Sequence, residues 1–533
     1  VVSQTYIGAP DRVKELVNSE AEEVKLRVEE FGAVWLANEI DCRVGLAEII
    51  DSVIPRDSRE KGPSIGEYFV YAVINRMIEP QSKRGLSDWF KNTAVREIRP
   101  VDVSELSSER FWEKWNRVSE SDLEIIINMF FEKIRTLEKI EPDCVLFDTT
   151  NYYTYMASDT PSELAKRGNN KDSKHHLRQI GLAMLACRGD MLPLYYQVYP
   201  GNLHDSKEFK KVIENLSDIV WGINGSKKRL TIVVDKGMNS EDNFAVIDNN
   251  RQIHFITTYS THYSEELTNI SLDKFSPVKQ DDGDDREPVL AYRTTGEYWG
   301  ADRTVVITFN PRTARKQSIV FEEKMDTLRE ELLQMRSKVN AGQAHWKNEE
   351  SVRERYVKIC EQLHVSTAVY ELSFEKNRTG LKMAFRQNVY WMSKHTATFG
   401  KSIIITDNSD WTTDEIVKAN LDRWQIELQF RQSKDEGHVC TMPIRHWTDG
   451  QIRCHLFTCV AAITYIRLLE RILRNNKIQM TGAEAIEKMK TLHSVLMIRK
   501  TKPIRQLEEP SKTQMMILKT MGYYENKSGG LQM

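Results

Sequence analysis

The sequence has few cysteines, and they form no close pairs. The chain has seven cysteines in 533 residues, and no two of them are separated by only two residues. The spacing of a zinc knuckle is therefore missing. Scattered thiols in a long chain are typical of a reducing compartment, so we expect a cytoplasmic protein.

Long hydrophobic runs are also missing. The longest apolar run, from Leu456 to Ile466, ends at Arg467 and is too short to cross a bilayer, so it predicts a buried helix. The N-terminus has no cationic segment followed by an apolar one, and we predict no signal peptide. The chain opens on Val1 rather than methionine, so we expect that the true start lies further upstream.

The chain has almost no net charge. The formal value is −2, with 40% hydrophobic and 29% charged residues, an ordinary globular composition that by itself indicates no nucleic acid. From Arg431 to the end, however, basic residues outnumber acidic ones. Such an excess is typical of a DNA-facing region, although a solvated helical tail has the same composition. The length predicts two or three domains.

Helical and strand patterns divide the chain. Residues 1–140 are predicted to be helical, with the clearest amphipathic run from Ser119 to Leu137. Strands are then expected at Cys144–Thr150, Gln179–Arg188, Leu192–Tyr199, Leu230–Asp235 and His254–Tyr259, with helices at His204–Asp218 and from Asn239. Three strands joined by short turns form an antiparallel meander, and the later strands require helical crossovers. This order predicts the α/β class, with an RNase H-like domain.

Residues 260 to about 410 interrupt that order and are predicted to form an insertion. They contain an acidic loop, Asp281–Asp285, and a charged helical stretch, Arg315–Gln362. Strands are expected to resume at Met383–Phe385 and Lys401–Thr406. A long helix is expected from Thr412, with further helices to about Lys502.

Two aspartates are expected at strand ends. Asp148 and Asp235 each lie at the end of an apolar strand, and neither strand contains a basic residue. Carboxylates at this edge of an open α/β sheet lie where ligands bind, and a bound cation relieves their mutual repulsion. An aspartate in this position also commonly caps a turn or a helix, so each residue alone leaves both interpretations open.

A third carboxylate lies in a charged helical stripe. At about 100° per residue, Asn420, Arg423, Glu427, Arg431 and Lys434 share one face of a helix. Apolar residues flank this stripe, namely Leu421, Trp424, Leu428, Ile426 and Phe430. The opposite face is polar (Asp422, Gln425, Gln429, Gln432 and Ser433), and we expect it to face solvent, with the charged stripe turned inward. An Arg423–Glu427 ion pair is the alternative role for these charges.

The three carboxylates suit phosphodiester chemistry. Two divalent cations about 4 Å apart activate a nucleophile and stabilise the leaving oxygen. Oxygen ligands suit Mg²⁺ or Mn²⁺, so we expect Asp148, Asp235 and Glu427 to be metal ligands. Arg423, Arg431 and Lys434 would supply positive charge to the phosphates.

The segment Arg423–Lys434 resembles the signature helix of bacterial insertion-sequence DDE transposases of the insertion-sequence-four superfamily. That signature is Tyr, two residues, Arg, three residues, Glu, six residues and Lys. Arg423, Glu427 and Lys434 match it, whereas Asn420 stands at the tyrosine position. Further similar segments are Phe147–Thr150, Arg167–Gly168 with Lys171–Asp172, Leu192–Leu194, Pro200–Asn202 with Asp205–Ser206, and Val234–Met238.

The resemblance implies metal-dependent cleavage at transposon ends and attack of the freed 3′-OH on target DNA. It implies that Asp148, Asp235 and Glu427 are catalytic and hold two divalent cations. The expected DNA contacts are Arg423, Arg431, Lys434, Arg167, Lys171, Lys236 and Trp299. Trp299 and Trp391 are candidates to stack on a flipped base, although tryptophans inside strands more often belong to a core.

The resemblance also implies partners and organisation. We expect binding to terminal inverted repeats and target DNA as a homodimer, without a membrane, in a bacterial or archaeal cytoplasm near the nucleoid. The expected domains are a helical region at 1–140 that binds DNA ends, a catalytic domain at 141–436 and a helical region at 437–533. The family implies a β-rich insertion, whereas the charged stretch here predicts helices.

Three alternatives are considered. A DDE-like nuclease or resolvase without strand transfer would use the same metals. A catalytically inactive DNA-binding derivative would have lost at least one carboxylate, and all three are present. A haloacid-type phosphohydrolase would need an aspartate two positions after Asp148, where Thr150 stands.

Overall fold

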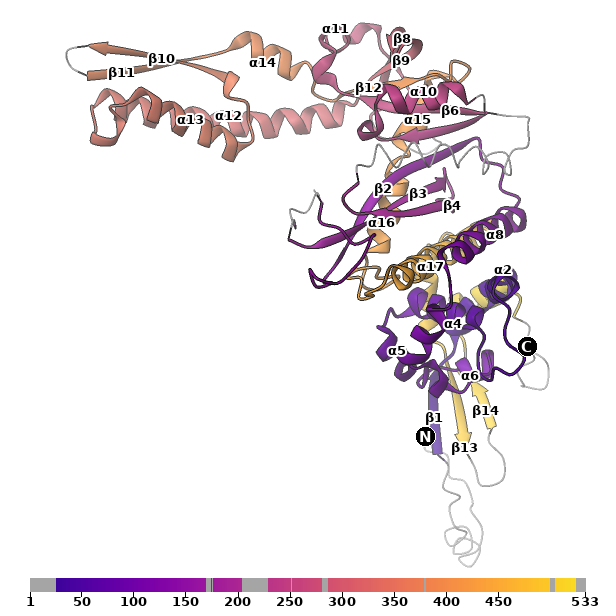
Figure 1. Cartoon of the computed structure of the whole chain (residues 1–533). Coiled ribbons are helices and arrows are strands. Elements are labelled where there is room, and N and C mark those ends of the chain that lie inside the picture. Colours follow the sequence, from indigo (N-terminus) through magenta and orange to yellow (C-terminus); the bar gives the residue numbers. More distant parts are fainter. Residues whose placement is uncertain are drawn as a thin grey trace, which may run out of the picture. The chain divides into compact units, whose positions relative to one another are not determined.

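The computed structural model describes residues 25–168, 174, 176–203, 229–250, 252–279, 286–377, 380–498 and 504–523. The chain forms two compact units (Figure 1). Unit 1 consists of residues 1–228 and 424–533, and unit 2 of residues 229–423. The predicted helix His204–Asp218, the acidic loop Asp281–Asp285 and Lys171–Asp172 lie outside the described residues.

The N-terminal part of unit 1 is helical, as predicted. Its helices are α2 (Gly32–Val44), α3 (Leu46–Val53), α4 (Ile65–Ile78), α5 (Lys83–Phe90), α6 (Val95–Ile98), the 3₁₀ turn η1 (Val103–Leu106), α7 (Ser108–Trp115) and α8 (Glu120–Glu138). Ser64 and Ser119 open α4 and α8 with capping boxes, in which each serine accepts a backbone hydrogen bond and the third helical residue caps in return.

These helices pack around a long C-terminal helix, α17 (Asp449–Asn475). Phe457 of α17 contacts the rings of Phe69 and Phe130, which lie on α4 and α8. The apolar run predicted to be a buried helix is buried inside α17, which confirms that prediction. None of the helices in the described part of the chain has the length and low charge needed to cross a membrane.

The prediction that the C-terminal part of unit 1 is helical is wrong in part. Helices α18 (Gly482–Lys490) and α19 (Lys512–Met521) are present, but strands β13 (His493–Ile498) and β14 (Ile504–Leu507) separate them. Strand β13 pairs with β14 and with β1 (Lys25–Glu30), where a helix was also expected. Backbone partners distant in sequence decide the conformation here, which a local helical pattern does not reveal.

A three-stranded antiparallel meander also belongs to unit 1, as predicted. It consists of β2 (Cys144–Thr154), β3 (Arg178–Cys187) and β4 (Pro193–Pro200). Strand β2 continues four residues beyond the predicted end at Thr150, because its second half stays paired with β3 through Tyr152↔Ile180. Asp148 therefore lies in the middle of its strand, which corrects its predicted place at a strand end.

Unit 2 begins with a parallel pair. Strand β5 (Leu230–Val234) is fully buried and pairs in parallel with β6 (Ile253–Tyr259), and helix α10 (Glu241–Asn249) connects them. Antiparallel strands then follow β6 in the order β12 (Lys401–Thr406), β9 (Ala301–Phe309), β8 (Leu290–Tyr298) and β7 (Ser276–Pro277). A meander followed by a strand–helix–strand unit is the element order of an RNase H-like domain, so the predicted fold class is confirmed.

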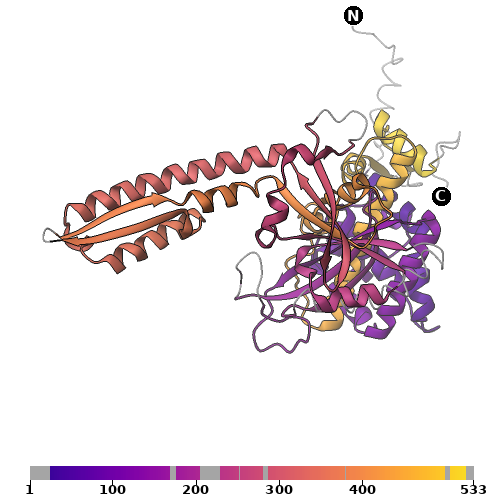
Figure 2. The ribbon, with the colours of Figure 1, turned by 90° about the horizontal axis from the view of Figure 1, so that it is seen from above.

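An arm projects from the sheet of unit 2 (Figures 1 and 2). It contains α12 (Pro311–Asn340), α13 (Glu349–Leu363), the hairpin β10 (Tyr370–Asn377) and β11 (Gly380–Gln387), and α14 (Val389–Thr396). Apolar residues along α12, including Leu328 and Leu332, pack with Val352, Val369 and Met383 into a core of the arm itself. The helices confirm the predicted charged helical stretch, and β12 returns the chain to β6.

The remaining elements of unit 2 are short. They are the 3₁₀ turns η3 (Lys236–Met238), η4 (Thr261–Tyr263), η5 (Leu272–Lys274), η6 (Ala344–Trp346) and η7 (Thr367–Val369), and helices α11 (Glu265–Thr268) and α15 (Thr413–Leu421). Helix α16 (Trp424–Ser433) opens the second segment of unit 1. The single long helix predicted from Thr412 is therefore two helices, separated by a turn at Asp422 and Arg423.

Candidate active site

Asp148 lies on one face of β2 together with Thr150 and Tyr152. Alternate residues of a strand point to the same side, so these three side chains share a face. The Asp148 side chain is half-buried, and its Oδ1 accepts a hydrogen bond of 2.8 Å from the backbone N–H of Thr149. The surroundings therefore leave the carboxylate partly accessible.

Helix α16 runs along this face of β2 in the direction of the strand. Near the C-terminal end of α16, Ser433 Oγ lies 2.8 Å from the hydroxyl of Tyr152. Near the N-terminal end, Gln425 Oε1 accepts a hydrogen bond of 2.8 Å from the backbone N–H of Gly189, in the turn next to the start of β2. Within unit 1, Glu427 therefore lies on the helix between the two anchoring residues, with its side chain exposed, and Asp148 lies on β2 between the start of the strand and Tyr152.

The faces of α16 differ from the prediction. Gln425, Gln429 and Ser433, expected in solvent, are buried, whereas Trp424 is 53% exposed. Glu427 and Arg431, expected to turn inward, are exposed. The physical reason is that Gln429 donates a hydrogen bond to the carbonyl of Met191, as Gln425 accepts one from Gly189, so the β3–β4 turn satisfies polar groups that would otherwise face water.

Asp235 directly follows the buried strand β5, as predicted. It precedes η3, but its side chain makes no capping hydrogen bond there, so helix capping does not explain this aspartate. Its Oδ1 accepts a hydrogen bond of 2.8 Å from Nη1 of Arg423, and both side chains are partly buried. Arg423 was expected to contact phosphate, and in this structure it neutralises the second candidate ligand.

The available donors fit a hard divalent cation. Asp148 and Glu427 belong to unit 1 and Asp235 belongs to unit 2, and each offers carboxylate oxygens, the ligands that Mg²⁺ and Mn²⁺ prefer. Among the residues that the structure describes, no cluster of three or more His, Cys, Asp or Glu side chains has the arrangement of a metal site. The chemistry of the donors therefore supports the metal assignment.

Basic side chains accompany the carboxylates in unit 1. Lys434 Nζ lies 5.6 Å from the centroid of the Tyr152 ring, so the residue that anchors α16 also contacts this lysine. Arg431 is exposed on the same helix as Glu427. Tyr152 was not identified from the sequence, although it lies two strand periods after Asp148 on the same face, which is a usable signal.

Arg167 lines a separate basic pocket in unit 1. This pocket has a volume of about 240 Å³ and also contains Lys166, Arg178 and Ser158. Arg167 donates a hydrogen bond of 2.9 Å to the hydroxyl of Ser158, and Arg178 donates one of 2.7 Å to the carbonyl of Thr160. Lys171, the other basic residue predicted in this segment, lies outside the described residues.

Lys236 and Trp299 both lie in unit 2. Lys236 is exposed in η3, beside Asp235. Trp299 lies in the turn between β8 and β9, with a φ of 52°, and stacks on Phe244 at 4.0 Å between ring centroids. Its ring also contacts Phe255 and Tyr259 edge-on, which favours the core role considered for this tryptophan. Trp391, expected in a strand, lies in α14 and stacks on His395.

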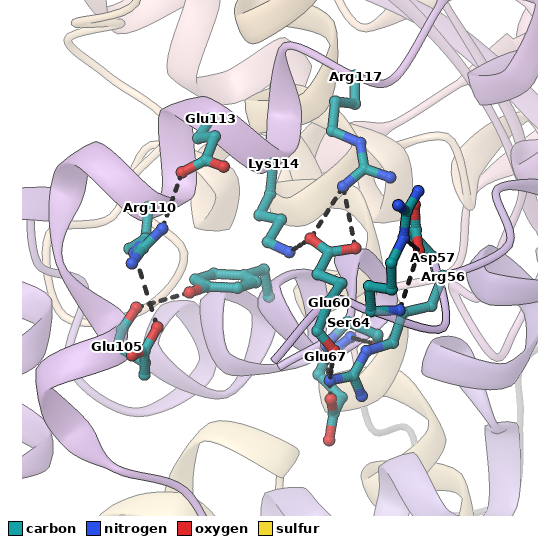
Figure 3. Close-up of polar contacts among 12 residues, drawn as sticks. Arg56, Asp57, Glu60, Ser64, Glu67, Glu105, Arg110, Glu113, Lys114 and Arg117 are labelled. Carbon is teal, nitrogen blue, oxygen red and sulfur yellow. Dashed lines mark hydrogen bonds and ion pairs between the residues drawn. The ribbon is translucent and has the colours of Figure 1, made fainter. Parts of the chain in front are cut away.

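A second polar cluster lies among the N-terminal helices (Figure 3). Glu60, in the loop Pro55–Pro63, pairs with Lys114 and Arg117. Lys114 is only 5% exposed, whereas Arg59 of the same loop is 90% exposed. The Glu60 carboxylate therefore fastens a loop that carries several exposed basic side chains to α7 and the residues that follow it.

A family model covers the part of the chain that contains the three candidate carboxylates. Residues 142–460 match the model of the family described as "Transposase DDE domain". No curated protein matches the sequence. A piggyBac transposase synaptic complex with hairpin DNA is similar at 11% identity and a TM-score of 0.39, covering 86% of this chain and 78% of that one. A Mos1 transposase paired-end complex with the left transposon end has 12% identity and a TM-score of 0.16, covering 40% of this chain and 64% of that one.

Proposed function

Because the chain belongs to the family of transposase DDE domains, we propose that Asp148, Asp235 and Glu427 are its catalytic residues and hold two divalent cations, Mg²⁺ or Mn²⁺. The enzyme is a DDE transposase that cleaves DNA and transfers strands. One observation carries the residue assignment: α16 is anchored along the face of β2 that bears Asp148, with Glu427 between the anchors.

Bound cations would activate the attacking oxygen and stabilise the leaving one. The side chains of this protein have separate roles. Arg423 holds the Asp235 carboxylate in place, and its guanidinium would be free to bind a DNA phosphate once Asp235 held a cation. Lys434, placed against Tyr152, and the exposed Arg431 add positive charge beside Glu427 for the same phosphates.

We also propose that the chain belongs to the insertion-sequence-four group with the Tyr-Arg-Glu-Lys signature. The spacing of Arg423, Glu427 and Lys434 supports this assignment. Asn420 replaces the tyrosine, and its buried Oδ1 has no hydrogen-bond partner among the described residues.

The proposed partners are transposon terminal inverted repeats and target DNA, bound by a homodimer in the cytoplasm near the nucleoid. Residues 1–140 are proposed to bind DNA ends, which the basic loop fastened by Glu60 supports. The proposed catalytic domain is 141–436, with an insertion at about 260–410, and 437–533 is the C-terminal region. Further proposed DNA contacts are Arg167, Lys171, Lys236 and, for a base, Trp299.

The acidic residues are tested by isosteric substitution. Asp148→Asn, Asp235→Asn and Glu427→Gln are each expected to abolish Mg²⁺-dependent end cleavage while DNA binding and the melting temperature stay close to wild type. The control is Glu436→Gln, an exposed carboxylate just beyond α16 that should cleave normally. Retained cleavage in any of the three variants would remove that residue from the metal site.

A second assay separates the transposase from a nuclease or resolvase that does not transfer strands. Pre-cleaved transposon ends are incubated with a target plasmid and Mg²⁺, and joined products are measured. Joined products are expected from the wild type and not from Glu427→Gln. Cleavage without joining would support the nuclease alternative, and binding without either reaction would support the inactive derivative.

A further inference from the structure

A groove lies at the root of the arm in unit 2. Its volume is about 810 Å³, and its wall includes Lys316, Lys324, Lys394 and Lys401 together with Trp391 and Phe399. Four lysines and a single carboxylate, Glu265, line it. None of the residues proposed above as catalytic or as DNA contacts lines this groove, so its positive charge requires a separate explanation.

Two helix faces form the opposite walls of the groove. On α12 the lining residues Lys316, Val320 and Lys324 recur every four positions, and on α14 Lys394 and His395 follow Trp391 by three and four positions. These spacings place each set on one side of its helix. The lysines of α12 therefore project into the groove from a common side, about 12 Å apart along the helix.

The positive charge in the groove is only partly neutralised. Lys394 forms an ion pair with Glu265. Lys401 donates hydrogen bonds to the carbonyls of Thr268 and Ile270, and burial lowers its pKa. Within the described part of the chain, Lys316 and Lys324 have no ion-pair partner. An anionic ligand would therefore meet two ammonium groups on α12 that pair with no carboxylate of the described residues.

We propose that this groove binds the phosphodiester backbone of duplex DNA, as a second DNA contact of the enzyme remote in sequence from the carboxylates. The proposal rests on the proposed function, which supplies the DNA. Each strand carries a phosphate about every 3.4 Å along the helix axis, so the spacing of Lys316 and Lys324 spans about three phosphates. Lysines act as point charges without the planar fork of arginine, which suits phosphates rather than base edges.

The test compares Lys316→Ala/Lys324→Ala with wild type. Dissociation constants are measured by fluorescence anisotropy in EDTA, with a transposon-end duplex and a scrambled duplex, between about 50 and about 200 mM salt. Loss of two phosphate contacts should reduce the slope of log Kd against log salt concentration by about 1.8. Raising the salt across this range should therefore weaken binding about tenfold less in the variant than in wild type. Both duplexes should respond equally.

The matched control is Lys358→Ala/Lys376→Ala, which removes two exposed lysines of the arm outside the groove. Its salt slope should equal that of wild type. An unchanged slope in the Lys316/Lys324 variant, an equal change in the control, or an effect confined to the transposon-end duplex would each overturn the proposal. Melting curves establish that both variants are folded.

Cleavage by the same preparations in Mg²⁺ separates the two proposals. If the Lys316/Lys324 variant has a reduced salt slope but the wild type never cleaves, the proposed reaction is refuted and the groove is still supported as a DNA contact. Normal cleavage by wild type with no change in slope would refute the groove alone.

Discussion

Arg423 donates a hydrogen bond to Asp235 across 2.8 Å, within unit 2. The two residues come from a turn and from the end of a buried strand, and they are 188 positions apart in sequence. The guanidinium provides the positive charge that a bound cation would otherwise provide. A metal ion that binds Asp235 must therefore compete with this arginine.

The competition predicts a change in metal affinity. Arg423→Gln removes a positive charge beside the carboxylate, so Mg²⁺ or Mn²⁺ should bind several-fold more tightly in calorimetric titrations without DNA. Arg329→Gln, an exposed arginine on α12, should bind the metal as wild type does. Unchanged or weaker metal binding in Arg423→Gln would exclude competition at Asp235.

Gln429 is predicted to hold α16 on the β3–β4 turn. Gln429→Ala removes the hydrogen bond from the fully buried Gln429 to the carbonyl of Met191, which should lower the free energy of unfolding by about 1–3 kcal/mol. Denaturant unfolding measures this loss. Gln387→Ala, an exposed glutamine on β11, should change it by no more than about 0.5 kcal/mol, and an equal loss in both variants would contradict the anchoring role.

Glu60 is predicted to stabilise the N-terminal helices more than a neighbouring surface glutamate does (Figure 3). Glu60→Gln leaves the largely buried Lys114 without its carboxylate and should reduce the free energy of unfolding by about 1–3 kcal/mol. The exposed pair of Glu113 with Arg110 is the matched control, and Glu113→Gln should cost no more than about 1 kcal/mol. Equal losses of unfolding free energy in the two variants would show that the Glu60 ion pairs stabilise the protein no more than a surface ion pair does.

His446 is predicted to make unit 1 less stable in acid. Burial, with nearby Lys83 and Arg76 acting in the same direction, lowers the pKa of this imidazole to about 3. Between about pH 3 and 6.5 the unfolded chain binds a proton that the folded chain does not, so stability is full above about pH 6.5 and falls as the pH falls.

His446→Asn should therefore reduce the slope of unfolding free energy against pH by up to about 1.4 kcal/mol per pH unit between pH 4.5 and about 6. Glu30 contributes a slope of the opposite sign, because burial raises its pKa to about 7. This contribution is the same in wild type and variant, so it cancels in the comparison. His176→Asn, an exposed control, should keep the wild-type slope. An identical slope in His446→Asn would mean that this imidazole is not the neutral group that titrates.

Local patterns predicted the elements whose conformation is decided locally. The meander, the buried strand before Asp235 and the amphipathic α8 have the expected periods and clear turn or capping residues. The positions of the three carboxylates on a strand, after a strand and on a helix were also predicted correctly in kind, although β2 extends past Asp148.

The features that the sequence pattern did not predict depend on contacts between residues that are distant in sequence. The face of α16 was assigned wrongly because Gln425 and Gln429 bind the backbone of the β3–β4 turn, which a polarity count does not include. Asp422 and Arg423 form a turn, so the stripe from Asn420 to Lys434 does not follow one continuous helix. The pairing of Arg423 with Asp235 likewise required the folded chain.

The pairing of β1 with β13 has a consequence for the order of synthesis. Lys25 pairs with Ile498, so β1 stays unpaired until a strand several hundred residues later in the sequence has been made, on the order of a minute later at ribosomal speed. Unit 2 is one continuous segment and leaves the ribosome while β1 is still without its partner. Unit 1 therefore becomes complete, and able to act on DNA, only after all of unit 2 and strand β13 have been made.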